Sequence, residues 1–294
     1  MSIPKLNAYP LPQAADFPAN KTAWRVEPKR AALLIHDMQR YFLAFYGEDS
    51  ALVNELVSKV EALRRWADSH GVPVIYTAQP TEQKPEDRAL LNDMWGPGLT
   101  TADPAVQVVT PRLAPREQDT VLVKWRYSAF QRSDLQEKMQ AWGRDQLVIC
   151  GVYAHIGCMM TACDAFMRDI QAFMVGDAVA DFSEEEHKMA LRYVATRCGA
   201  VIAQSDLAVA GDDAALTREW LKAQVLTVLE DGDDSLAGDD NLLDYGLDSI
   251  RVMELVAQWQ KLGLEIGFED LAQDLTLDGW WAAIQAKLPQ EASS

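Results

Sequence analysis

The sequence predicts an α/β domain, built on a mostly parallel sheet with helices on both faces, followed by a small all-α domain. Three observations lead to this prediction. Short apolar runs alternate with stretches of helical spacing as far as about residue 205, a pattern typical of a parallel sheet. The 294 residues exceed the usual size of one domain, about 100–200 residues. The last part of the chain also differs sharply in charge from the rest.

Short apolar runs predict the strands. Residues 31–36 form such a run and end at the polar Asp37, which suits a strand buried on both faces. Further strands are predicted at residues 72–78, 120–125, 146–151, 172–176 and 200–204.

Apolar spacing and capping residues predict the intervening helices. Residues 50–69 repeat apolar side chains at helical intervals and are followed by Gly71, a typical residue beyond a helix end. Ser183 and Glu186 have the spacing of a capping box and predict a helix that runs to Arg197. Two more helices are expected at 134–142 and 157–169.

The C-terminal part is far more acidic than the rest. Of the 44 acidic and 27 basic residues, 19 acidic and 5 basic lie between Asp206 and Ser294, a net charge of −14, which leaves −3 for residues 1–205. The acidic part also holds Trp220, Trp259, Trp280 and Trp281 in regular apolar spacing, so we expect it to fold as about four helices. We assign residues 1–208 to the first domain, 209–214 to a linker, 215–289 to the helical domain and 290–294 to a tail.

Composition excludes several classes of function. No apolar run reaches the ~20 residues that a membrane helix needs, and a net charge of −17 disfavours nucleic acid as a partner. The four cysteines have neither a disulfide-scaffold nor a zinc pattern, which predicts reduced thiols and no metal. The first residues lack the features of a signal peptide, so we expect a cytoplasmic protein.

Polar residues at the predicted strand ends are the first candidates for a site, because ligands bind beyond the carboxyl ends of parallel strands. Asp37 follows the first strand, Gln79 the second and Lys124 the third, while the fourth leads through a loop to Gly157. One such aspartate is often only a helix cap; an acid and a lysine at separate strand ends form a more specific arrangement.

These residues resemble the isochorismatase-like hydrolase superfamily, which also contains nicotinamidases. The resemblance covers residues 1–205 and rests on the segments at 34–42, 76–80, 94–98, 124–130 and 151–165. It implies a three-layer fold with Asp37 and Lys124 as catalytic residues. Its register puts Gly157 where the amidases have a nucleophilic cysteine. Cys158 comes one position later, about 100° around a helix, and is expected to point away.

A glycine at this position is typical of true isochorismatases, so the resemblance implies hydrolysis of the enolpyruvyl ether of isochorismate to pyruvate and 2,3-dihydro-2,3-dihydroxybenzoate. Asp37 is the candidate general acid, which must be protonated near neutral pH, and Lys124 either binds a substrate carboxylate or orients Asp37. Gly157 leaves space and offers N–H groups to an anion. The candidate substrate-binding residues are Gln79, Arg88, Phe42, Trp95, Tyr127 and Tyr153.

The four histidines rank below Asp37. His155 is a possible base, but a histidine in a loop is more often structural. His36 should point opposite to Asp37 along the strand, and His70 and His187 are expected at the surface.

The motif at 242–250 resembles the phosphopantetheine attachment site of carrier proteins. It implies 4′-phosphopantetheine on Ser249, with Asp248 helping a phosphopantetheinyl transferase to hold its Mg²⁺; hydrolysis itself would need no metal. The whole chain is similar to the bifunctional isochorismatase and aryl carrier proteins of catechol siderophore assembly, enterobactin or vibriobactin type. The implied partners are an aryl-adenylating enzyme, a downstream condensation domain and a second copy in a homodimer.

Met253, Phe268 and Ala272 are candidates for an apolar docking patch beside Ser249, although packing in the helical core is an open alternative. Two other functions also stay open: a nicotinamidase-like amidase that uses Cys158, and an inactive scaffold fused to a carrier. Intact Asp37 and Lys124 argue against the scaffold.

Overall fold

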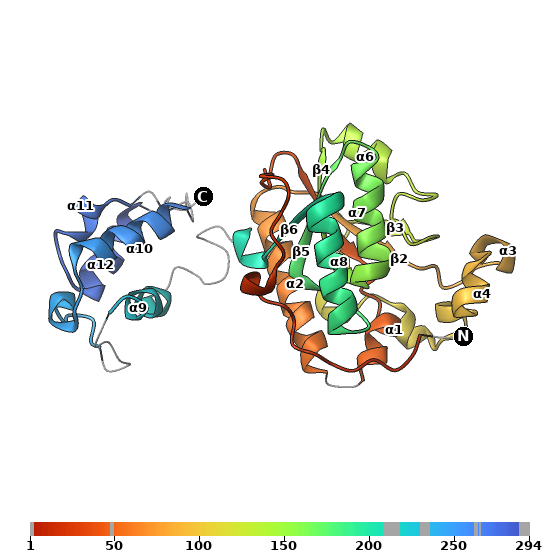
Figure 1. Ribbon diagram of the computed structural model, residues 1–294, viewed down its shortest axis with the longest axis horizontal. Coiled ribbons are helices and arrows are strands. Elements are labelled where there is room, and N and C mark those ends of the chain that lie inside the picture. Colours follow the sequence, from red (N-terminus) through yellow and green to blue (C-terminus); the bar gives the residue numbers. More distant parts are fainter. Residues whose placement is uncertain are drawn as a thin grey trace. The chain divides into compact units, whose positions relative to one another are not determined.

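The computed structural model describes residues 3–47, 50–207, 218–229, 236–261, 264 and 266–287. The chain divides into two compact units, Met1–Leu207 and Ala208–Ser294; the first contains the sheet and the second is helical (Figure 1). The predicted linker at 209–214 and tail at 290–294 lie outside the described residues, as do the ends of the predicted helical domain at 215–217 and 288–289.

Within the described residues, six parallel strands form one sheet in the order β3-β2-β1-β4-β5-β6. β1 lies between β2 and β4, and its six residues are all buried. This arrangement confirms the predicted fold class. The strands are β1 (Ala31–His36), β2 (Val74–Ala78), β3 (Thr120–Val123), β4 (Gln146–Val152), β5 (Gln171–Ala180) and β6 (Gly199–Ile202).

Helices cover both faces of the sheet, which makes three layers. α2 (Ala51–Ser69) packs on one face, where its apolar side chains share a core with Leu33 and Ile35. α6 (Leu135–Ala141), α7 (Met159–Phe166) and α8 (Glu184–Arg197) cover the other face, on which Leu34 lies, and α7 and α8 run side by side (Figure 1). Neighbouring residues of β1 enter different cores because side chains alternate along a strand.

Short helices interrupt the loops. They are α1 (Arg40–Leu43), α3 (Pro85–Arg88), α4 (Leu91–Trp95) and α5 (Pro104–Gln107), together with 3-10 turns at Ala14–Asp16, Ala44–Tyr46, Gly98–Thr101, Pro111–Leu113 and Gln204–Asp206. The helix predicted at 157–169 begins instead with a π-helical turn over Ala154–Cys158 and ends as α7 at Phe166.

β5 is longer than the predicted strand at 172–176 because it continues through a buried aspartate. Asp177 is 3% exposed. Its carboxylate accepts hydrogen bonds from Lys59 Nζ at 2.8 Å and from the backbone N–H of Gln204 at 2.7 Å. A polar residue that the pattern marks as a strand end is therefore stabilised inside the strand by partners from distant segments.

His187 is buried, so the expectation of a surface position was wrong. Its Nε2 lies 2.9 Å from the carbonyl oxygen of Gly176, and its Nδ1 lies 3.0 Å from the Tyr9 hydroxyl. Burial lowers the pKa of His187 to about 4, which keeps the ring neutral in this core. His70 is half-buried and contacts the carbonyl oxygen of Trp66.

The second unit is a small helical domain with its own core. Its described helices are α9 (Arg218–Leu226), α10 (Ser249–Lys261), α11 (Phe268–Leu271) and α12 (Leu277–Lys287), with a 3-10 turn at Leu242–Tyr245. Trp259 and Trp280 are fully buried at its centre, and their rings meet edge to face. These helices agree with the predicted all-α carrier fold.

The described residues include no helix long and apolar enough to cross a membrane. All four cysteines are free thiols; Cys163 Sγ and Cys198 Sγ lie 3.5 Å apart, within hydrogen-bond distance, and form no disulfide.

Candidate active site

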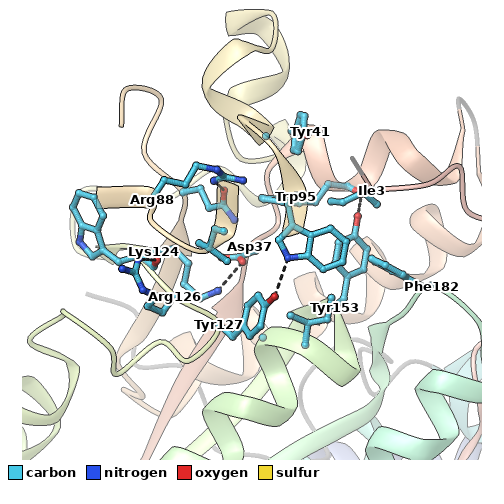
Figure 2. A pocket seen from close by; sticks show the side chains of 17 residues that line it. Ile3, Asp37, Tyr41, Arg88, Trp95, Lys124, Arg126, Tyr127, Tyr153 and Phe182 are labelled. Atoms are coloured by element: carbon cyan, nitrogen blue, oxygen red, sulfur yellow. Dashed lines mark hydrogen bonds and ion pairs between the residues drawn. The ribbon is translucent and has the colours of Figure 1, made fainter. Parts of the chain in front are cut away.

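Asp37 and Lys124 meet at the carboxyl edge of the sheet. Asp37 follows β1 with a left-handed backbone, φ +48°, and both side chains are almost completely buried. The Lys124 ammonium donates a hydrogen bond of 2.9 Å to Asp37 Oδ2, and the Thr77 hydroxyl donates one of 2.6 Å to Asp37 Oδ1. The carboxylate is therefore held at both oxygens; Figure 2 shows the contact with Lys124.

This environment favours the ionised form of Asp37. Burial alone would raise the pKa of the carboxyl, but His36, the Lys124 ammonium and the hydrogen bond from Thr77 together lower it below its ordinary value. This lowered pKa disagrees with the sequence-based expectation that Asp37 stays protonated near neutral pH. A proton must reach the carboxylate before it can act as an acid.

A cavity lined by charged, polar and aromatic side chains opens above this ion pair. All nine candidate residues of the first unit line it: Asp37, Phe42, Gln79, Arg88, Trp95, Lys124, Tyr127, Tyr153 and Gly157. The structure thus brings together residues that follow four different strands, β1 to β4; several of them are labelled in Figure 2.

Eight lining residues were missed by the sequence reasoning: Ile3, Tyr41, Leu91, Gly98, Trp125, Arg126, Ile156 and Phe182. Phe182 follows the carboxyl end of β5; the strand was predicted to end at residue 176, so this signal was lost. Ile3 comes from the N-terminal segment, and its place on the cavity wall has no local sequence signal.

Arg88 is buried rather than exposed on a helix. It is 4% exposed, and its Nε donates to the Gly96 carbonyl oxygen at 2.7 Å. Its Nη1 lies 3.5 Å from Gln79 Oε1, and no acidic side chain among the described residues pairs with it. Gly98 permits this placement, because a Cβ there would lie 2.5 Å from Arg88 Nη2. A buried guanidinium without a carboxylate partner is suited to bind an anion.

Aromatic rings form one wall of the cavity. The Trp95 indole N–H donates to the Tyr127 hydroxyl at 2.8 Å, and the Tyr153 hydroxyl donates to the Phe42 carbonyl oxygen at 2.6 Å. Phe182 packs edge to face against Tyr153, with ring centroids 4.7 Å apart. The hydrogen bonds hold these rings in place, so the wall is preformed.

Gly157 lies at the cavity, whereas Cys158 does not. Cys158 is fully buried in the core under α6, α7 and α8, and burial raises the pKa of its thiol well above the ordinary value. The thiol thus points away from the cavity, as the register predicted.

His36 is not directed away from Asp37, so that expectation was wrong. Its Nδ1 lies 3.6 Å from Asp37 Oδ2, because the left-handed backbone at Asp37 breaks the alternation of the strand. The space beside Gly157 is not free for a ligand either: a Cβ there would lie 2.0 Å from His36 Cε1. The ring of His36 fills it.

His155 lies outside the residues that line the cavity. Its Nδ1 is 2.5 Å from Asp181 Oδ1, and its ring packs against Phe182. His155, Asp181 and Glu186 are close enough to one another to share a cation, but the Asp181 carboxylate also accepts hydrogen bonds from the backbone N–H groups of His155 and Phe182. Through these contacts His155 supports Phe182 of the aromatic wall, which is a structural role.

Ser249 is exposed at the start of α10. The preceding Asp248 is also exposed, and its Oδ1 accepts a hydrogen bond from the Arg251 N–H at 2.9 Å. Leu242 and Leu247 are buried on either side of the turn, which closes with Gly246 at φ +83°. Two buried leucines thus fix a loop that presents a serine hydroxyl to the solvent.

The three candidate patch residues do not enter the core of the second unit. Met253 is 52% and Phe268 39% exposed, and Ala272 is exposed on the segment after α11. Packing of all three in the core is therefore wrong. Ile250 and Leu243, which were not among the predicted patch residues, are also largely exposed.

The three-layer parallel fold, the buried Asp37–Lys124 pair and the glycine at 157 define an isochorismatase-type hydrolase joined to a carrier domain. The family model "Isochorismatase domain" matches residues 31–206, and "Phosphopantetheine attachment site" matches residues 219–284. The chain belongs to the isochorismatase family.

Two relatives match it over nearly the whole length. The chain is 53% identical to "Enterobactin synthase component B" of Escherichia coli (strain K12), over 98% of this chain and 100% of the relative. It is 44% identical to "Isochorismatase" of Bacillus subtilis (strain 168), over 99% of this chain and 97% of the relative. A cysteine hydrolase from Pseudomonas syringae pv. phaseolicola 1448A shares the fold, with a TM-score of 0.57 and 24% identity over 65% of this chain and 95% of that one.

Proposed function

We propose that this chain hydrolyses the enolpyruvyl ether of isochorismate to pyruvate and 2,3-dihydro-2,3-dihydroxybenzoate, and that it carries the derived 2,3-dihydroxybenzoyl group as a thioester. The observation that carries the first half is the buried Asp37–Lys124 pair in a cavity with glycine, not a nucleophile, at position 157. The full-length likeness to a relative named "Isochorismatase" supports the first half, and the match to the phosphopantetheine attachment site supports the second.

Hydrolysis begins with the transfer of a proton to a carbon atom of the substrate. Asp37 gives its proton to the terminal methylene of the enolpyruvyl group, and the C=C electron pair forms the new C–H bond. The resulting oxocarbenium ion captures water, which loses a proton to give a hemiketal. Collapse of the hemiketal breaks the bond between its central carbon and the oxygen attached to the ring. The hydroxyl proton of the hemiketal passes to that oxygen, and pyruvate and the dihydrodiol are released. No covalent enzyme intermediate is formed, so a thiol is not needed.

We expect bound substrate to raise the pKa of Asp37, so that the carboxylate takes up a proton. Isochorismate carries two carboxylates, and negative charge near a carboxyl group raises its pKa. Arg88 and Gln79 are suited to hold one of these carboxylates, since the guanidinium is buried and lacks an acidic partner. Lys124 Nζ, 2.9 Å from Asp37 Oδ2, keeps the acid oriented. Phe42, Trp95, Tyr127 and Tyr153 enclose the ring of the substrate.

Ser249 is our proposed attachment site for 4′-phosphopantetheine. Its exposed position at a helix start leaves the hydroxyl open to a phosphopantetheinyl transferase, and Asp248 beside it would help that enzyme to hold Mg²⁺. The thiol of the attached group supplies the thioester chemistry. We assign no metal to the hydrolysis itself.

The two activities belong to one route. A separate dehydrogenase oxidises the dihydrodiol to 2,3-dihydroxybenzoate, and an aryl-adenylating enzyme loads it on the carrier. A downstream condensation domain then takes the aryl group, and the patch formed by Met253, Phe268 and Ala272 is its proposed docking surface. Loading that depends on ATP favours the cytoplasm, and we propose that the protein acts there as a homodimer.

Incubation with isochorismate, followed by measurement of pyruvate, tests the hydrolase. We expect pyruvate release, and no ammonia from nicotinamide. Cys158→Ala should keep kcat/KM within about twofold, since no thioester forms. A folded but inactive Cys158→Ala variant would favour the amidase instead, and absence of turnover on both substrates would favour an inactive scaffold.

A further inference from the structure

His36, the last residue of β1, is enclosed between two glycines. Gly151 lies in β4, and Gly157 lies in the π-helical turn that follows this strand. Gly151 has φ +109°, and a Cβ there would lie 2.2 Å from the backbone oxygen of His36. At Gly157 a Cβ would lie 2.0 Å from Cε1 and 2.6 Å from Nε2 of the His36 ring. The backbone and the ring of His36 thus each take the space that a side chain on the opposing glycine would need.

The ring cannot turn aside easily. Its Nδ1 lies 2.8 Å from the carbonyl oxygen of Val152, and because a carbonyl only accepts, Nδ1 carries the hydrogen. The side chain is fully buried. The ring atoms closest to a Cβ at 157 are Cε1 and Nε2, at 2.0 and 2.6 Å, whereas the anchored Nδ1 would lie 3.0 Å from it. Removing them would open the space at 157 without loss of the anchor.

Asp37 comes directly after this enclosed residue. Its left-handed backbone, φ +48°, is uncommon outside glycine, and its Oδ2 lies 3.6 Å from the His36 Nδ1. A shift of the His36 backbone or ring would therefore move the carboxylate relative to Lys124 and the cavity. Misplacement of a catalytic group by about 1 Å lowers rates about 10²-fold.

We propose that His36 is the positioning residue of this site: anchored on Val152 and enclosed by Gly151 and Gly157, it sets the direction of Asp37 and occupies the space where a side chain at 157 would stand. Glycine at 157 is then a requirement of His36, not a space for substrate. The inference deepens the proposed hydrolysis and rests on it only for its kinetic test.

The test is a cycle of substitutions at 36 and 157, measured by kcat, KM and melting temperature in the full-length protein. The backbone of Gly157 lies outside the left-handed region, so its conformation does not strain an alanine there. The obstacle to an alanine is the ring of His36. We expect Gly157→Ala to lower kcat about 10²-fold and to lower the melting temperature by several degrees. His36→Asn keeps an N–H near the position of Nδ1, 3.0 Å from a Cβ at 157, but lacks Cε1 and Nε2, the two atoms that come closer.

The double variant His36→Asn/Gly157→Ala should recover kcat at least about tenfold over Gly157→Ala, a strongly non-additive result. His36→Ala/Gly157→Ala, without the anchor, should recover less. Gly176→Ala is the matched control: a Cβ there would lie 2.6 Å from Phe17 Cζ, away from the cavity, so its melting temperature should fall while kcat stays within about twofold.

Additive losses of kcat and melting temperature in the double variants would overturn the proposal, because residues 36 and 157 would then act independently. His36→Asn should also keep the shape of the wild-type pH profile; loss of one limb would make the ring a proton-transfer group instead of a positioning residue. If the wild type releases no pyruvate, the proposed function fails, and the melting-temperature cycle still decides whether His36 and Gly157 are coupled.

Discussion

The two units of this chain differ in the exposure of their functional groups: the first buries them and the second exposes them to solvent. In the first, Asp37, Arg88 and Lys124 are each 4–6% exposed; in the second, Ser249 and Asp248 are exposed and the apolar Met253 is 52% exposed. The net charge is −3 over residues 1–205 and −14 over the rest. A group that performs chemistry gains from burial, because charges interact more strongly away from water. A group on which other proteins act must be reached by them.

Ser249→Ala should abolish the activity of the second unit and leave that of the first unchanged. The variant has no hydroxyl to accept the phosphopantetheinyl group, so the mass increment and the aryl loading should vanish while isochorismate hydrolysis stays within about twofold of wild type. Mass spectrometry after treatment with a transferase measures the first and pyruvate release the second. Ser235, which also follows an aspartate, gives the matched control Ser235→Ala; modification that persists in Ser249→Ala would contradict the assignment.

Asp37→Asn should give the next largest effect, in the other unit. Asparagine keeps the size of the side chain but cannot donate a proton to carbon, so kcat should fall by about 10²–10⁴. Loading of Ser249 should not change. Near-normal turnover would remove Asp37 from the mechanism, and a loss of loading would show that the units are coupled.

The pH dependence of hydrolysis sharpens the account of the buried site. The pKa of Asp37 is lowered in the free protein, so the carboxyl is ionised at neutral pH, and the reacting complex contains one more proton. The value of kcat/KM should therefore fall with rising pH, up to about tenfold per unit, whereas kcat should vary less. A flat kcat/KM profile between pH 6 and about 9 would mean that Lys124 supplies the proton within the pair.

Charge on the exposed apolar patch should affect transfer but not loading. Met253→Glu and Ala272→Glu, made separately, should each lower aryl transfer to the acceptor amine about tenfold, because a desolvated charge would face the condensation domain. Gln258→Glu adds the same charge to another exposed position of α10 and should leave transfer unchanged. Circular dichroism checks the fold, and equal transfer in all three variants would exclude the patch as a docking surface.

Separation of the units should have the smallest effect. Each has its own buried core, so a fragment that ends at Leu207 should hydrolyse isochorismate within about twofold of the full chain. A fragment from Leu216 should fold and accept phosphopantetheine. Loss of either activity on truncation would show that the two cores do not stabilise their sites independently.

Much of the site was predictable because its residues stand at strand ends. Asp37, Gln79 and Lys124 follow apolar runs, and parallel strands bring such positions to one edge. Arg88 and the aromatic residues came only from the family resemblance, since a lone arginine on a short helix is usually exposed. Phe182 was missed because Asp177, a buried polar residue with partners from α2 and the β6 loop, looked like the end of its strand.

The sequence by itself determined the two-domain organisation, the parallel sheet, and the acid and lysine at the strand ends, because these follow from local periodicity, charge and motif spacing. The absence of a nucleophile at 157 came from the register of the family resemblance. Only the tertiary structure decided the orientation of His36, the burial of His187 and Arg88, and the exposure of Met253 and Phe268. Each of these depends on partners far along the chain: the Val152 carbonyl for His36, Gly176 for His187 and Gly96 with Gly98 for Arg88. A pattern of neighbouring residues carries no information about such contacts.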